Sequence, residues 1–295
     1  MAEKRFEFQK IRDFGENISD TFLFIRQESR PLLRSFFAIC AVFILLNAVV
    51  AGLFQYNFLK TMAFDPYSGS IDYGARLRGV FSPLYFMTIL TSVMALTSME
   101  VALFGYIKLY TEKGNESPEI DEVWSLFKKY FLKVFFYHLP ILFIIIIGTV
   151  CCLIPGVYFF TVFAPFATIL VIEELSFSEA FSRCFYLIRE EFWLSFGIYV
   201  IAYILYYIAS MLFGGIFSGA GYLLKFLTSG SFFETQQVIQ SFVNFFGLIF
   251  YIIPLTSITL HFFTLREKKD GTGIMNRIDS IGERNRNLDD SDEEY

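Results

Sequence analysis

The uncharged stretch VFFYHLPILFIIIIGTVCCLIPGVYFFTVFAPFATILVI, residues 134–172, decides the fold class. It runs for 39 residues without Asp, Glu, Lys or Arg. A membrane-spanning helix needs about 20 apolar residues to cross a hydrocarbon core about 30 Å thick. The stretch is therefore too long for one span and suits two. Pro155 and Gly156 lie near its middle and predict the tight turn of a helical hairpin.

Four further apolar stretches flank this hairpin. They cover residues 35–59, 79–107, 192–224 and 235–265, and only the second contains a formal charge, at Glu100. Blocks such as residues 140–147 do not alternate between polar and apolar side chains, which favours helices over the strands of a membrane barrel. The sequence therefore predicts an all-α integral membrane protein, a six-span helical bundle of three hairpins.

The composition agrees with a membrane protein. The chain of 295 residues is 55% hydrophobic and 20% aromatic, with 39 phenylalanines, and only 18% of its residues are charged. Soluble domains average about 25% charged residues, so this chain has too little charge to cover a soluble surface. The net charge of −5 and the lack of a basic stripe argue against nucleic-acid binding. The predicted partners are the lipid bilayer and other membrane proteins.

Lys and Arg are concentrated in alternate loops. With a cytoplasmic N-terminus, the four cytoplasmic segments hold 7, 5, 2 and 6 of the 24 basic residues, and the outer segments hold the remaining four. These cytoplasmic segments are residues 1–34, 108–133, 173–191 and 266–295. Basic residues accumulate on the cytoplasmic side of membrane proteins, so both termini are predicted to be cytoplasmic.

This topology divides the chain into three parts. Residues 1–34 form a cytoplasmic amphipathic segment that has no signal-peptide apolar region, so the first span is expected to act as an uncleaved anchor. Residues 35–265 form the six-span domain. Residues 266–295 form a cytoplasmic tail whose acidic end, LDDSDEEY, is predicted to be disordered.

Three cytoplasmic segments combine an acidic start, an amphipathic stretch and the beginning of a span. They are residues 18–37, 120–136 and 177–196, and in the third Ser176 and Glu179 have the spacing of a helix capping box. Apolar stripes of this kind suit helices that lie in the membrane interface. They equally suit helices that pack on neighbouring helices of the same chain, and the sequence leaves both arrangements open.

The stretch CLIPGVYFFTVFAPFATILVIEELSFSEAFSRCFYLIREEFWLSFGIYV, residues 152–200, resembles a bacterial family of polytopic membrane proteins. The family includes the membrane domain attached to some glycerophosphodiester phosphodiesterases, and many standalone proteins. The resemblance rests on Pro155-Gly156, an acidic residue at Glu173 or Glu174, and Phe192-Trp193 at the next span. It implies the membrane fold and a location in the bacterial cytoplasmic membrane. The diesterase chemistry resides in a separate soluble domain, so the resemblance implies no catalytic residue here.

Three ionisable side chains fall inside predicted spans, namely Glu100, His138 and His261. Their predicted depths are similar, so a Glu–His cluster is geometrically feasible. A charged carboxylate near the bilayer centre costs about 2.5–3.5 kcal/mol on insertion scales, so Glu100 should face the bundle interior, be protonated or be paired. A proton or ion relay and a purely structural hydrogen-bonding role are both open for this group.

Neither a cofactor nor a metal is expected. The sequence contains no nucleophile elbow, phosphate-binding loop or zinc-protease motif. Its four cysteines, Cys40, Cys151, Cys152 and Cys184, have neither zinc-site nor disulfide-framework spacing and are expected to serve as small apolar side chains.

Three functions fit this pattern. The first is a non-enzymatic scaffold or accessory subunit of a membrane complex, which fits the lack of motifs. The alternative is a transporter or lipid-handling protein that uses Glu100, which requires a cavity reaching that carboxylate. The third is an intramembrane enzyme, which requires several polar groups around one pocket. The neighbours of Glu100 in the folded chain discriminate between these hypotheses.

Overall fold

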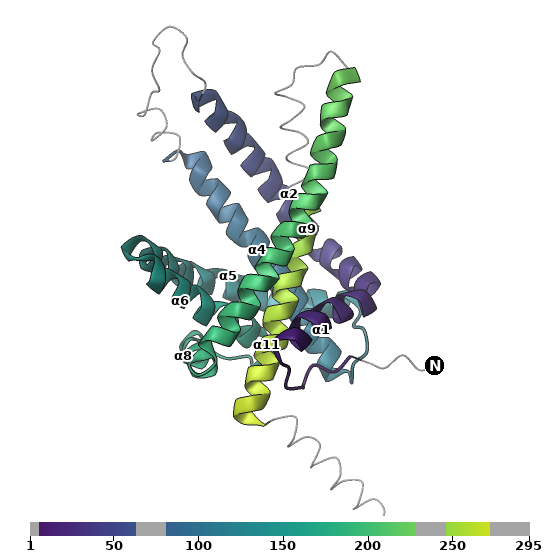
Figure 1. Ribbon diagram of the computed structural model, residues 1–295, viewed down its shortest axis with the longest axis vertical. Helices are drawn as coiled ribbons and strands as arrows, with labels where there is room; N and C mark the ends of the chain where they lie inside the picture. The colour runs from purple at the N-terminus through teal and green to yellow at the C-terminus, as the bar shows by residue number, and fades with distance from the viewer. Residues whose placement is uncertain (1–5, 63–80, 228–245, 272–295) are drawn as a thin grey trace, which may run out of the picture.

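The computed structural model describes residues 6–62, 81–227 and 246–271, and the regular structure in these ranges is entirely helical (Figure 1). Six helical stretches are long and apolar enough to cross a membrane. They are α2 (Ser29–Met62), α4 (Pro83–Glu112), α5 (Ile120–Cys151), α6 with α7 (Leu153–Phe163 and Phe166–Ile172), α9 (Phe192–Leu227), and η1 with α11 (Leu248–Tyr251 and Ile252–Asp270). The predicted all-α six-span architecture is confirmed.

The helix α11 is the central element of the bundle. It contacts α1, α4, α8 and α9, and in Figure 1 it runs through the middle of the molecule behind α9. Nearly every side chain from Ile252 to Leu265 is buried. The stretch alternates bulky residues with Ser and Thr, whose small side chains allow helices in a membrane to approach closely.

The α2 and α4 helices form the first hairpin and lie side by side in Figure 1, where α9 leans the other way. Asn47 of α2 joins the pair, because its amide donates to the hydroxyl of Ser92 at 2.8 Å. Its amide also lies 3.3 Å from the hydroxyl of Thr91. Polar bonds of this kind hold spans together where water is absent.

The turn of the second hairpin lies at Cys152 and not at Pro155-Gly156, which corrects the prediction. Cys152 has an extended backbone, with φ −166° and ψ 141°, and α6 begins at the next residue. Pro155 fits inside the first turn of α6 because the amide groups there have no partner within the helix. Gly156 serves the close approach of the two helices, since a Cβ at this position would lie 2.2 Å from Oγ1 of Thr149.

The three amphipathic segments do not form three separate surface helices. Residues 120–136 are part of α5, which continues without a break into the span, and residues 29–37 are part of α2. The separate helices are α1 (Phe14–Gln27) and α8 (Phe177–Ile188), which pack on the bundle. Phe24 of α1 and Cys184 of α8 are fully buried. Internal packing therefore covers part of these two apolar stripes, while Phe22 of α1 keeps an exposed fraction of 44%.

The ends of both separate helices are capped by their own side chains. The predicted capping box of α8 is confirmed, since the Ser176 amide donates to the Glu179 carboxylate at 2.9 Å and the Ser176 hydroxyl caps the helix. Asp13 and Glu16 form an equivalent box at the start of α1. These bonds fix where each surface helix begins before the neighbouring span is reached.

In the part of the chain that the structure describes, residues 108–133, 173–191 and 266–271 meet at one end of the bundle. Lys108 of α4 pairs with Glu174, and Lys113 pairs with Glu122 of α5 at 2.6 Å. Arg183 of α8 pairs with Glu173 at 3.0 Å and also with Asp270 of α11. Ion pairs thus join segments that are distant in sequence but were predicted to lie on the same side.

Candidate functional site

The structure places Glu100 of α4 beside His138 of α5. The Oε2 atom of Glu100 lies 3.2 Å from Nε2 of His138, and the two side chains keep exposed fractions of 17% and 21%. Thr97 lies one turn before Glu100 on α4, and its hydroxyl is 3.2 Å from Nδ1 of His138. Both ring nitrogens of His138 therefore face a polar atom of α4.

The local sequence explains why Glu100 faces α5. Around this level, α4 is buried on almost all sides, with Met99 and Val101 fully buried between neighbouring helices. On α5, Pro140 follows His138 by two residues inside the helix. A proline lacks an amide hydrogen, so the carbonyl of residue 136 loses its usual helical donor.

Glu100, His138 and Thr97 line a cavity of about 130 Å³ between α4 and α5. Aliphatic side chains form the rest of its wall, namely Val93, Leu96, Ile141, Leu142 and Ile145. A pocket of this size has room for a few water molecules, which Glu100, His138 and Thr97 could bind. The site is therefore a small chamber, open on one side, whose mostly aliphatic wall holds three polar side chains.

One oxygen of the Glu100 carboxyl group remains able to bind a proton. The Oε2 atom of Glu100 is buried and has no aligned hydrogen bond among the described residues, although His138 lies at ion-pair distance. A carboxyl and an imidazole at 3.2 Å can hold one proton between them, either as a carboxylic acid beside neutral imidazole or as a carboxylate beside imidazolium. A proton can therefore move between the two side chains without a change in net charge, whereas uptake or release of a proton by the pair changes its net charge by one.

The second histidine does not join this site. Nε2 of His261 lies 2.7 Å from the hydroxyl of Ser195, and its ring contacts Tyr199 edge-on. These contacts tie α11 to α9, and His261 is fully buried between them. Of the two histidines that sequence analysis grouped with Glu100, the structure brings only His138 to it.

Sequence reasoning missed the polar groups around the pair. Thr97 gave no signal beyond its position one turn before Glu100. A second polar contact was missed elsewhere in the bundle, where Tyr203 of α9 and Tyr251 of η1 join their hydroxyls at 3.0 Å. These two tyrosines could not be paired from sequence, because they are 48 positions apart.

Across residues 6–62, 81–227 and 246–271, no three His, Cys, Asp or Glu side chains gather in a way that could hold a metal ion. Comparisons of the chain with family models, curated proteins and solved structures find no match.

Proposed function

We propose that this protein is a proton-linked membrane transporter or lipid-handling protein, and that the Glu100–His138 pair is its intramembrane proton-binding site. The observation that supports the proposal is the 3.2 Å contact of two ionisable side chains in a cavity between α4 and α5. Ionisable groups inside membrane spans are costly to insert, and they mark ion and proton pathways.

The depth of the pair supports this proposal. Glu100 is eight residues before Lys108, where the predicted cytoplasmic segment begins. At about 1.5 Å per residue, this separation corresponds to about 12 Å along α4. The chamber thus lies inside the predicted span, where a carboxylate is not needed for solubility.

We also propose that the protein lies in the bacterial cytoplasmic membrane with both termini in the cytoplasm. Support comes from the segregation of Lys and Arg, 20 of 24 of which fall in alternate loops. The ion pairs of Lys108 with Glu174 and of Lys268 with Glu191 join three of these loops at one end of the bundle. The bacterial assignment rests on the resemblance of residues 152–200 to the membrane family. This resemblance implies no diesterase active-site residue in the chain.

Proton binding by the reconstituted protein tests the function without knowledge of its substrate. Proteoliposomes on a solid-supported membrane are exposed to a pH jump, and the resulting charge displacement is recorded. We expect a transient current in the wild type that Glu100→Gln removes. Glu112→Gln, which alters an exposed carboxylate at the end of the same helix, should leave the current unchanged.

The result separates the proposal from a purely structural role. A scaffold that uses Glu100 only for helix packing would show equal currents in the wild type and in Glu100→Gln. It would instead lose partner proteins when the bundle is perturbed. Equal currents in the two proteins would therefore contradict the proton-linked function.

A further inference from the structure

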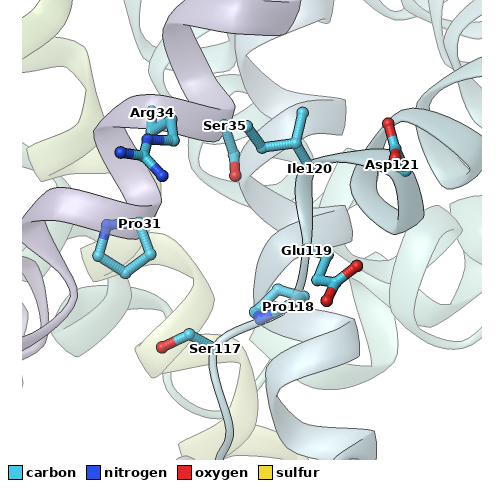
Figure 2. Close-up of a pocket in the computed structure, with 8 residues that line it drawn as sticks. All are labelled: Pro31, Arg34, Ser35, Ser117, Pro118, Glu119, Ile120 and Asp121. Carbon is cyan, nitrogen blue, oxygen red and sulfur yellow. The ribbon is translucent and has the colours of Figure 1, made fainter.

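A second and larger pocket lies at the end of the bundle where the ion pairs gather. Its volume is about 520 Å³, within the range of small-molecule sites. Figure 2 shows Pro31, Arg34 and Ser35 of α2 on one side and residues 117–121, which lead into α5, on the other. The pocket is separate from the Glu100–His138 chamber and shares no residue with it.

The α2 side of the pocket presents two unused hydrogen-bond donors. Neither the guanidinium of Arg34 nor the hydroxyl of Ser35 has a hydrogen-bond or ion-pair partner among the described residues. Ser35 is only 3% exposed, and Figure 2 shows its oxygen directed toward the space between α2 and Ile120. A hydroxyl without a partner, on a buried residue beside a free guanidinium, is suited to donate a hydrogen bond to the oxygens of an anionic group.

Unlike Arg34 and Ser35, the neighbouring polar side chains already form hydrogen bonds within the protein. The hydroxyl of Ser117 donates to Oε2 of Glu28 at 2.6 Å. The phenol of Tyr106 donates to the same oxygen at 2.6 Å. Glu28 is thus occupied by α4 and the α4–α5 loop, which leaves Arg34 as the pocket's free positive charge among its lining residues.

The opposite side of the pocket is acidic. Glu119 and Asp121 lie at the beginning of α5 and line this side. Two carboxylates would repel a ligand that carried only negative charge. They would attract a ligand whose far end is an ammonium group, so the pocket complements a zwitterion.

We propose that this pocket binds a phosphoethanolamine group, with its phosphate on Arg34 and Ser35 and its ammonium toward Glu119 and Asp121. Arg34 and Ser35 lie where the apolar stretch of α2 begins, so this side of the pocket is expected at the level of the lipid headgroups. The phosphoethanolamine group can come from phosphatidylethanolamine or from free phosphoethanolamine. The proposed phosphoethanolamine binding does not depend on the proton-linked function, so each proposal can be contradicted without affecting the other.

Lipid binding to the purified full-length protein tests the proposal. Native mass spectrometry compares phosphatidylethanolamine with phosphatidylglycerol of the same acyl chains, and calorimetry measures free phosphoethanolamine. We expect Arg34→Gln to weaken binding of the phosphoethanolamine group roughly tenfold, as befits a lost charge-assisted hydrogen bond. Arg30→Gln removes an exposed charge one turn earlier on the same helix, outside the pocket, and should have no effect.

A second variant tests the ammonium side without touching Arg34. Asp121→Asn combined with Glu119→Gln should reduce the preference for phosphatidylethanolamine over phosphatidylglycerol. Binding of either ethanolamine compound that depends on Arg34 supports the site, and the compound that binds identifies the source of the group. Equal binding of both lipids to the wild type, or binding that Arg34→Gln leaves unchanged, would overturn the proposal.

Discussion

The Nε2 atom of His138 lies 3.2 Å from Oε2 of Glu100, and this contact joins α5 to α4 inside the membrane-spanning part of the bundle. An ionisable pair at this depth has both a structural and a chemical role. It holds two spans together, and it provides a group that can change protonation inside hydrocarbon. The predictions below test the pair and the helix contacts that position it.

The pair should be energetically coupled. A double-mutant cycle with Glu100→Gln and His138→Gln should give a coupling free energy of about 0.5–3 kcal/mol, because the two side chains are in direct contact. Unfolding in mixed micelles, followed by circular dichroism, measures the four proteins. A parallel cycle with Glu100→Gln and His261→Gln should be close to additive, since His261 has its own partner in Ser195. Additivity in the first cycle would show that the contact contributes nothing.

The α5–α6 hairpin should depend on Gly156. Gly156→Ala would place a methyl group 2.2 Å from Oγ1 and 2.8 Å from Cα of Thr149, so the two helices must separate. We expect the free energy of unfolding to fall by about 1–3 kcal/mol, the usual cost of overpacking. The matched control is Gly215→Ala on α9, where a new Cβ meets nothing within 4 Å. It should raise stability by about 0.5–1 kcal/mol, as expected when alanine replaces glycine within a helix.

The α1 helix should detach when its buried bond to α11 is lost. Ser257 donates its hydroxyl to Oδ1 of Asn17 at 2.7 Å, and Asn17 donates back to the Ser257 carbonyl at 3.3 Å. Asn17→Ala leaves buried polar atoms unpaired, at a cost of about 1–3 kcal/mol. Hydrogen–deuterium exchange should accelerate across residues 14–27 and remain unchanged in α5. Gln27→Ala, at an exposed position of α1, should exchange as the wild type does.

Stability should fall on acidification through Glu174. Its hydrogen bond from Lys108, with help from Tyr130 and Lys129, lowers the pKa of this carboxyl from 4.5 to about 2. A lowered pKa in the folded state contributes stability above pH 4.5, and that stability is lost as the pH falls toward about 2. The melting temperature of Glu174→Gln should therefore lie below that of the wild type at neutral pH and converge with it in acid.

The difference in melting temperature between the wild type and Glu174→Gln should also depend on salt concentration. The side chain of Glu174 is 48% exposed, so solvent screens its ion pairs and the effect should be modest. The difference between the wild type and Glu174→Gln should narrow further at high ionic strength. An unchanged pH dependence in the variant would show that other carboxylates account for acid unfolding.

Much of the fold could be predicted because its signals are local. The apolar run at residues 134–172 predicts two spans from length alone, and Ser176 with Glu179 predicts the start of α8. The turn was misplaced by three residues because Pro155 can occupy the first turn of a helix as readily as a loop. The continuous α5 was also missed, since a change of polarity along a helix does not end it.

The site was only partly predictable because its members come from different helices. Glu100 stood out by its charge within a span, and a contact with a histidine could be anticipated. The choice between His138 and His261 depended on how α5 and α11 rotate about their axes, which no single-sequence pattern determines. Thr97 and the Tyr203–Tyr251 pair carry no distinguishing sequence signal, so only the folded arrangement reveals them.

Infrared difference spectroscopy of the reconstituted protein tests the central claim most directly. Spectra are taken between about pH 5 and pH 8, the range in which histidine titrates. The account predicts a carboxyl band that changes with pH in the wild type, is absent in Glu100→Gln, shifts in His138→Gln and persists in Glu112→Gln. A spectrum in which Glu100→Gln removes no pH-dependent carboxyl band would contradict the account, because the protonation of Glu100 would then be fixed.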